Sequence, residues 1–301
     1  MNGLTRFLFF GNYFYGLCTV ALSVEASLQQ YASLNRLPYY LLVFVATVLY
    51  YTHAYIAEPS DNSDNKRAAW YYRNRKWLRW SQLVLTILTV SFTFYLLREN
   101  WNALWQLNPY QWCLIGIFPL VAILYYGSAS PQRSTHNLRN NGWLKPFVIG
   151  FVWAGAVTIY PVLFKSIEDH TPYTPGLVSG LLFVKNFMYI TMLCIMFDIK
   201  DYAADHNRQL KTFVVRYGLR RTIFYILIPL TLVGLGTFIV FAVLRDFPVL
   251  RILINTIPFI LLIIVAYSMH RRKSILYYLA IIDGLMLAKA VCGIIGISLI
   301  K

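Results

Sequence analysis

The chain has 301 residues, of which 58% are hydrophobic and only 13% are charged, and its mean hydropathy is +0.54. A soluble domain of this length carries about a quarter charged residues, so the composition excludes an ordinary water-soluble protein. The net charge of +15 does not indicate nucleic-acid binding, because the lysines and arginines stand in short connections between apolar runs, as the positive-inside rule produces.

Taken in chain order, the apolar runs predict an all-α, polytopic membrane bundle of about nine transmembrane helices, since each run approaches the ~20 residues that cross the hydrocarbon core. The expected helices lie at residues 7–27, 37–57, 79–97, 110–127, 143–164, 176–197, 221–244, 249–269 and 274–299. The first run lacks the small-residue cleavage site of a signal peptide and is expected to be retained. With no repeat or low-complexity tract, residues 1–301 are expected to form a single transmembrane helical domain.

The connections between these runs alternate in charge. Those at 58–78, 128–142, 198–220 and 270–273 are basic, and the intervening ones hold only scattered charges. By the positive-inside rule, this alternation predicts a multi-pass protein of the bacterial inner (cytoplasmic) membrane, with a cytoplasmic N-terminus. The same basic residues can also hold an anionic substrate or anionic lipid headgroups.

The segment after the sixth apolar run carries an unusual row of acids. The chain has only 12 acidic residues, and Asp198, Asp201 and Asp205 fall within eight positions. At ~100° per residue, they share roughly 60° of one helical face. Such a row is costly unless cations neutralise it. Carboxylate oxygens, completed by water or phosphate, are ligands that Mg²⁺ prefers.

Two readings of this segment remain open. In the first, Arg208 and Lys211, one turn further on, meet the negative charge of a metal-bound phosphate group. In the second, the segment is a solvated amphipathic helix whose acids pair with Lys200, Arg208 and nearby loop bases.

The pattern D-x-x-D-x-x-x-D, followed by Arg, Lys-Thr and Arg-Tyr-Gly, resembles the second aspartate-rich motif of the UbiA superfamily of intramembrane prenyltransferases. The resemblance implies a bundle of nine transmembrane helices. It also implies two facing aspartate-rich motifs that hold Mg²⁺ and a prenyl diphosphate, from which a hydrophobic, electron-rich acceptor takes the isoprenoid. The resemblance implies these roles: Asp198 and Asp201 as catalytic and metal-binding, Asp205 as a further metal ligand, and Arg208, Lys211, Arg139 and Lys145 as diphosphate-binding.

The first motif of that family, N-x-x-x-D-x-x-x-D, is missing at residues 48–62. His53, Glu58 and Asp61 are the candidates for that side of the site, although Pro59 interrupts the face that the two acids would share. This departure leaves two functions open: an Mg²⁺-dependent prenyltransferase, or a catalytically degenerate UbiA-like protein that binds a lipid or a partner. A transporter is disfavoured because the chain shows no inverted repeat.

Four polar residues lie deep in apolar runs: Lys185, Asn186, Asp283 and Lys289. Ionisable groups at such depth usually face the bundle interior and pair with one another. A Lys185–Asp283 or Asp283–Lys289 contact is therefore expected, and the alternative is that Asp283 or a tyrosine orients the acceptor or its proton.

Overall fold

The computed structural model describes residues 3–57, 66–126, 141–207, 209–271 and 273–298. Within these ranges all regular structure is helical and there is no β-strand, which confirms the all-α class. Six helices in these ranges are long and apolar enough to cross a bilayer: Arg75–Glu99, Lys145–Glu168, Leu177–Ala203, Leu219–Leu244, Val249–Ser268 and Ile275–Ser298. The bent pair Gly3–Phe10 and Tyr13–Gln29 adds a further span if the two helices are counted as one. Shorter apolar helices cover Leu37–His53 and Pro109–Tyr125. The protein is thus a multi-pass integral membrane protein, and the count of nine crossings stays a prediction.

The chain divides into two compact units: Met1–Ala21 with Leu34–Gln106, and Leu22–Ser33 with Leu107–Lys301. Each unit is described by itself below. The single domain expected over residues 1–301 stays a prediction.

The first unit contains α1 (Gly3–Phe10), the first part of α2 (Tyr13–Gln29), α3 (Leu37–Ala57), α4 (Lys66–Arg73), α5 (Arg75–Glu99) and α6 (Trp101–Trp105). Helix α3 packs against α5 through Val45, Val48 and Leu85. Only 11% of the apolar window of α5 is buried. Because Trp80, Val90 and Phe94 are exposed on α5, this helix presents an apolar surface suited to lipid.

The continuous helix expected over residues 7–27 is wrong, because α1 and α2 meet at a bend of 58°. Asn12 adopts φ 65, a left-handed conformation that ends α1. Its buried side-chain amide donates hydrogen bonds to Thr52 Oγ1 and Tyr71 OH, both at 3.1 Å. The polar contacts of this one residue therefore fix the bend, and a hydropathy pattern does not register them.

The second unit contains α7 (Pro109–Tyr126), α8 (Lys145–Ala154), η2 (Gly155–Ile159), α9 (Tyr160–Glu168), α10 (Leu177–Asn207), α11 (Phe213–Tyr217), α12 (Leu219–Thr222), η3 (Ile223–Leu227), α13 (Ile228–Leu244), α14 (Val249–Ser268), α15 (Ile275–Tyr277), η4 (Tyr278–Ile282) and α16 (Gly284–Ser298). The η segments are single π-helical turns inside longer spans. Two of them directly precede Tyr160-Pro161 and Ile228-Pro229. A π-turn suits these places because proline lacks the N–H that an α-helix needs.

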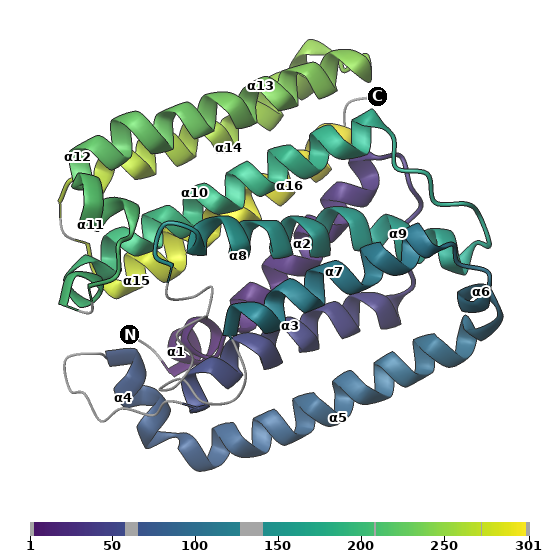
Figure 1. Ribbon diagram of the computed structural model, residues 1–301, viewed down its shortest axis with the longest axis horizontal. Coiled ribbons are helices and arrows are strands. Elements are labelled where there is room, and N and C mark those ends of the chain that lie inside the picture. The colour runs from purple at the N-terminus through teal and green to yellow at the C-terminus, as the bar shows by residue number, and fades with distance from the viewer. Residues whose placement is uncertain (1–2, 58–65, 127–140, 208, 272, 299–301) are drawn as a thin grey trace. The chain divides into compact units, whose positions relative to one another are not determined.

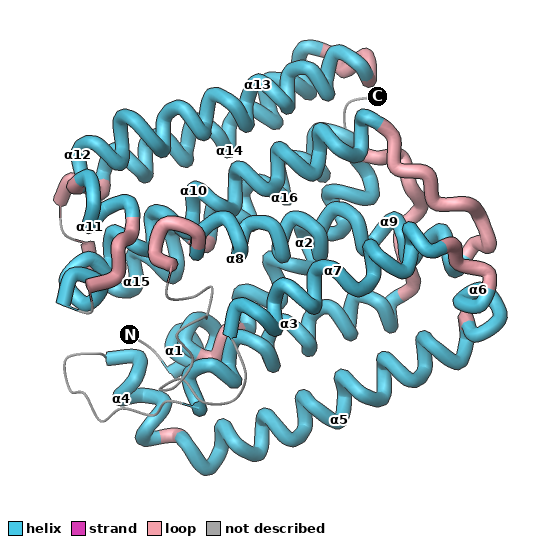
Figure 2. Tube along the Cα trace, in the orientation of Figure 1, coloured by secondary structure: helices cyan, strands magenta, loops and turns pink. Residues whose placement is uncertain are grey.

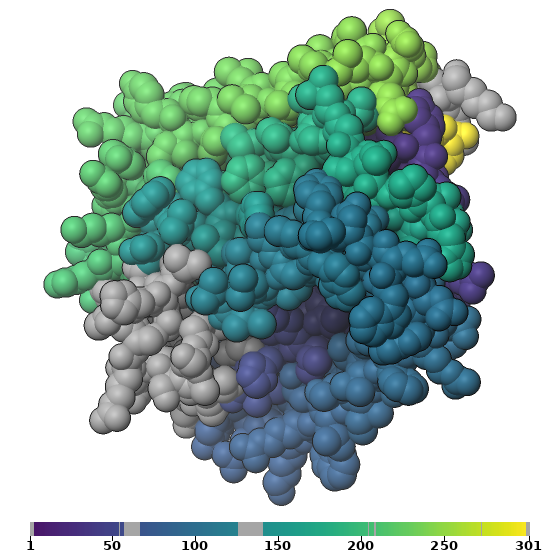
Figure 3. Space-filling view, turned by 45° about the vertical axis from the view of Figure 1, so that its right-hand side comes forward, coloured from purple at the N-terminus to yellow at the C-terminus, as the bar shows by residue number. Residues whose placement is uncertain are grey.

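Helix α10 forms the core of the second unit. It packs against α8 and α13, while α14 packs against α13 and α16 (Figure 1). Tyr189, Met192, Ile195 and Met196 on α10 are fully buried. Helix α13, at the upper edge of Figure 3, exposes Leu232, Val240 and Val243, as expected for a lipid-facing surface.

The loops of the second unit gather at its two ends. The connection between α9 and α10 lies at one end, and residues 141–144 before α8 and 209–212 before α11 lie at the other (Figure 2). Helix α10 runs from the first end to the second, so its two termini reach different groups of loops.

Candidate functional site

The three aspartates of the row lie on one continuous helix. The sixth span was expected to end at residue 197, but α10 continues to Asn207 and carries Asp198, Asp201 and Asp205 in its last turns. Asp198 is 0% exposed and Asp205 is also buried, whereas the side chain of Asp201 is 42% exposed. The helical placement of the row is thus as expected, and the chemical role of the row stays a prediction.

Lys145, the first residue of α8, pairs with the first aspartate of the row. Its Nζ lies 2.8 Å from Asp198 Oδ1. The other carboxylate oxygen, Asp198 Oδ2, is buried and receives no hydrogen bond from the described residues. An unsatisfied buried acceptor costs about 1–3 kcal/mol. Asp198 therefore keeps the capacity to bind one further cation or donor.

The turn at the end of α10 brings the following loop back against α8. Gln209 adopts φ 56, and Leu210 N donates to Asp205 O at 2.9 Å, which ends the helix. A Cβ at Gly142 would lie 2.7 Å from the backbone N of Thr212. Only glycine fits this approach, so the turn before α8 lies directly on the backbone that carries Lys211.

The structure describes some of the other predicted site residues but not all of them. Lys211 is exposed in this loop, and Asp201 pairs with Lys200 at 3.2 Å. Arg139 and Arg208 lie outside the described residues, as do Glu58 and Asp61. His53 is exposed on α3, in the first unit. The structure thus joins Lys145 to the aspartate row and leaves the first-motif side as a prediction.

The row offers few ligands to any one ion. Among the residues described, no three His, Cys, Asp or Glu side chains form a group that could hold a metal. Helical rise explains this, because Asp198 and Asp205 are about 10 Å apart along the axis whereas Asp198 and Asp201 are only about 4.5 Å apart. Mg²⁺ is commonly bound by one or two carboxylates, with water and substrate phosphate completing its shell. Asp198 and Asp201, with the unpartnered Asp198 Oδ2, fit that kind of site.

A buried ionic cluster in the second unit was missed by the sequence analysis. Glu25 on α2 lies 3.3 Å from Lys185 Nζ and 2.6 Å from Lys289 Nζ, and Lys185 also donates to Gln29 Oε1 at 2.7 Å. The expected pairing of these lysines with Asp283 is wrong, because both use Glu25. The available signal was the single acid within the first apolar run, which needed a buried partner.

Comparison with known proteins bears on the fold. No protein-family model and no curated protein matches the chain. A solved structure, from work on the biosynthesis of digeranylgeranylglyceryl phosphate synthase in membranes, is similar with a TM-score of 0.56 and 14% identity, over 99% of each chain. At this identity the similarity shows the fold alone. The protein is an all-α membrane bundle whose fold is similar to that of a UbiA-type membrane prenyltransferase.

Proposed function

We propose that the protein is an Mg²⁺-dependent intramembrane prenyltransferase of UbiA type, which moves an isoprenoid from a prenyl diphosphate to a hydrophobic acceptor. The observation that carries the proposal is the buried carboxylate of Asp198, with Lys145 on one oxygen and no described partner on the other. The similar fold of a membrane prenyltransferase supports it.

In this proposal the row and its basic neighbours bind the diphosphate. Asp198 and Asp201 would hold one Mg²⁺, whose charge would offset the negative charge of the leaving group. Asp205, about 10 Å from Asp198 along the helix, would not reach the same ion. Lys145 holds Asp198 in place through its 2.8 Å contact and presents positive charge to the diphosphate. Lys211 lies on the loop packed against Gly142 and adds a second cation, with Arg139 and Arg208 as further candidates.

The chemistry needs charge stabilisation more than proton transfer. When the allylic C–O bond breaks, the electron pair leaves with the diphosphate and the allylic carbon becomes positive until the acceptor attacks it. Preorganised cations beside the departing oxygens lower this barrier, more strongly where water is excluded. The burial of Asp198 provides such a place at the end of an apolar bundle.

Asp198→Asn tests the proposal, because it keeps the shape of the side chain and removes its charge. Membranes containing the variant should release diphosphate from a series of prenyl diphosphates at least about 10²-fold more slowly than the wild type. Asp246→Asn, the same change at an exposed aspartate after α13, should keep the wild-type rate. Equal rates for Asp198→Asn and the wild type would remove Asp198 from the site.

The second candidate is a catalytically degenerate protein of this fold that binds a lipid or a partner. The absence of two carboxylates four apart at residues 48–62 favours it, since a two-metal clamp needs ligands from both sides. Saturable binding of a prenyl diphosphate without any turnover of bound substrate would support this candidate over the enzyme.

A further inference from the structure

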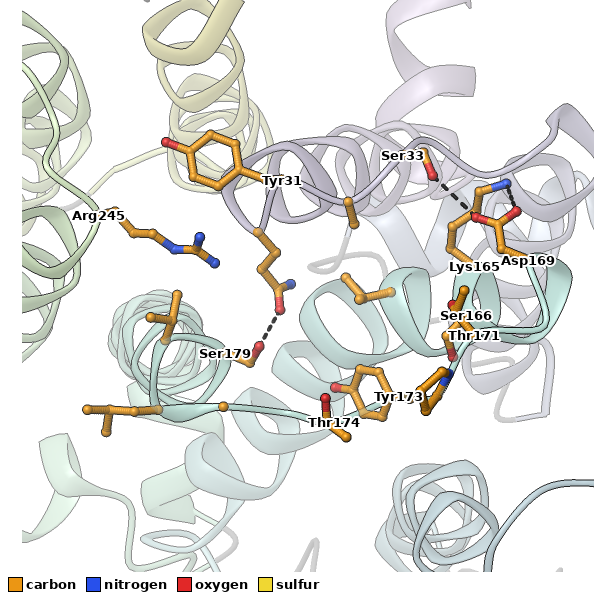
Figure 4. Close-up of a pocket in the computed structure, with 17 residues that line it drawn as sticks. Tyr31, Ser33, Lys165, Ser166, Asp169, Thr171, Tyr173, Thr174, Ser179 and Arg245 are labelled. Carbon is orange, nitrogen blue, oxygen red and sulfur yellow. Dashed lines mark hydrogen bonds and ion pairs between the residues drawn. The ribbon is translucent and has the colours of Figure 1, made fainter.

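A cavity of about 660 Å³ opens at the end of the second unit that lies away from Asp198. It is lined by residues 30–33, which follow α2, by the connection from Asp169 into α10, and by Arg245, which follows α13 (Figure 4). Ser179 in its wall and Asp198 are on the same helix, about 28 Å apart by helical rise. The cavity is therefore separate from the proposed diphosphate site.

The cations beside the cavity differ in how they are neutralised. Lys165 pairs with Glu168 at 3.2 Å and with Asp169 at 2.9 Å. Arg245 has no carboxylate partner among the described residues. Its guanidinium carbon lies 4.9 Å from the centre of the Tyr31 ring, and its buried Nε has no acceptor in those ranges. Figure 4 shows the Arg245 side chain extending into the space below Tyr31. The Arg245 side of the cavity thus carries uncompensated positive charge.

A second arginine, on α14, is not part of the cavity lining but contacts the lining residue Tyr31. Arg251 is only 5% exposed, and its guanidinium carbon lies 5.7 Å from the Tyr31 ring centre. Nη1 donates to Tyr31 OH at 3.3 Å, but Nε and Nη2 are buried and find no acceptor in the described part of the chain. The buried Glu25 is already shared by Lys185 and Lys289. An arginine keeps its proton in a protein, so its positive charge cannot be removed by deprotonation. The two guanidinium groups beside Tyr31 therefore favour the binding of an anion.

A neutral donor points into the same cavity. Tyr173 is 6% exposed, and its hydroxyl has no hydrogen-bond partner among the residues that the structure describes. Burial raises the pKa of Tyr173, so the hydroxyl keeps its proton and can donate. In Figure 4 this hydroxyl is directed toward the middle of the cavity.

We infer that this cavity binds the phosphate group of an anionic amphiphile at Arg245 and Tyr173, with Arg251, which contacts Tyr31 in the cavity wall, adding to the positive charge. Guanidinium groups bind phosphate through paired, charge-assisted hydrogen bonds. The rim includes Leu177, an apolar lining residue that is 71% exposed at the start of a span. A headgroup phosphate held at Arg245 would place acyl chains along this rim. A soluble phosphate ester offers the same charged group without the chains.

Native mass spectrometry of the purified full-length protein in detergent tests this site, with phosphatidylglycerol as the probe and phosphatidylcholine as the zwitterionic comparison. The wild type should bind phosphatidylglycerol in preference. The pair Arg245→Gln with Arg251→Gln should weaken that binding at least about tenfold. Arg221→Gln, the same change at an exposed arginine on α12, should leave it unchanged.

Two further measurements keep the test decisive. Tyr173→Phe removes only a hydroxyl, so the variant should fold and bind phosphatidylglycerol a few-fold more weakly, even if the double arginine variant does not fold. Competition by inorganic phosphate or glycerol 3-phosphate would assign the site to soluble phosphate esters, and no competition would assign it to lipid. Equal phosphatidylglycerol binding by the wild type, the folded double variant and Tyr173→Phe would overturn the inference, as would no preference over phosphatidylcholine in the wild type.

Discussion

Removing the carboxylate of Glu25 should destabilise the second unit more than any surface change. Glu25 neutralises Lys185 and Lys289 at 3.3 and 2.6 Å, and all three side chains are buried. Glu25→Gln leaves two buried positive charges without a counter-charge. Breaking a buried ion pair from one side costs about 3–5 kcal/mol. Lys185→Met instead leaves the neutral Glu25–Lys289 pair, and its main loss is the donor to Gln29 Oε1, worth about 1–3 kcal/mol.

Unfolding of the purified variants by SDS titration, followed by circular dichroism, measures this difference in free energy. Glu99→Gln, an exposed glutamate at the end of α5, is the matched control and should change stability by less than about 0.5 kcal/mol. If Glu25→Gln costs no more than Lys185→Met, the cluster does not act as an ion network and the reasoning fails.

Three further predictions concern positioning. Gly142→Ala should slow diphosphate release, because its Cβ would meet Thr212 N at 2.7 Å and shift the turn that carries Lys145; Gly116→Ala, where nothing lies within 4 Å, should not. Lys145→Met should raise the KM for prenyl diphosphate in steady-state kinetics, because it removes a cation from the proposed site; an unchanged KM would separate Lys145 from the diphosphate. Asn12→Ala should lower the free energy of unfolding by about 1–3 kcal/mol in SDS titration, since it removes the buried bonds to Thr52 and Tyr71.

The spans were predictable because crossing a bilayer imposes a length and an apolar composition on each one. The expected helix at 37–57 coincides with α3, and the one at 249–269 ends one residue from α14. The end of α10 was misplaced because the charged residues from Asp198 onward indicate where the membrane ends. They do not mark the end of the helix, since a helix can continue into water. The helix continues there to Asn207.

The partners of buried charges could not be predicted from one sequence. Glu25 and Lys289 are 264 positions apart and Glu25 and Lys185 are 160 apart, so their pairing depends on which helix faces pack together. The same holds for the contact between Lys145 and Asp198, 53 positions apart. Lys145 was a candidate only through a family resemblance. Arg251 could not be recognised at all, because its local sequence does not show whether a carboxylate faces it.

The most direct test of the proposed activity follows both products of the transfer in the same membranes. A radiolabelled prenyl diphosphate, offered at several chain lengths, should yield one diphosphate released for each prenyl group recovered in the lipid extract. Chelation of Mg²⁺ should stop both, and Asp198→Asn should slow both together. If no chain length gives a prenylated lipid, or if Asp198→Asn membranes make it at the wild-type rate, the aspartate row is not the catalytic site of a prenyltransferase.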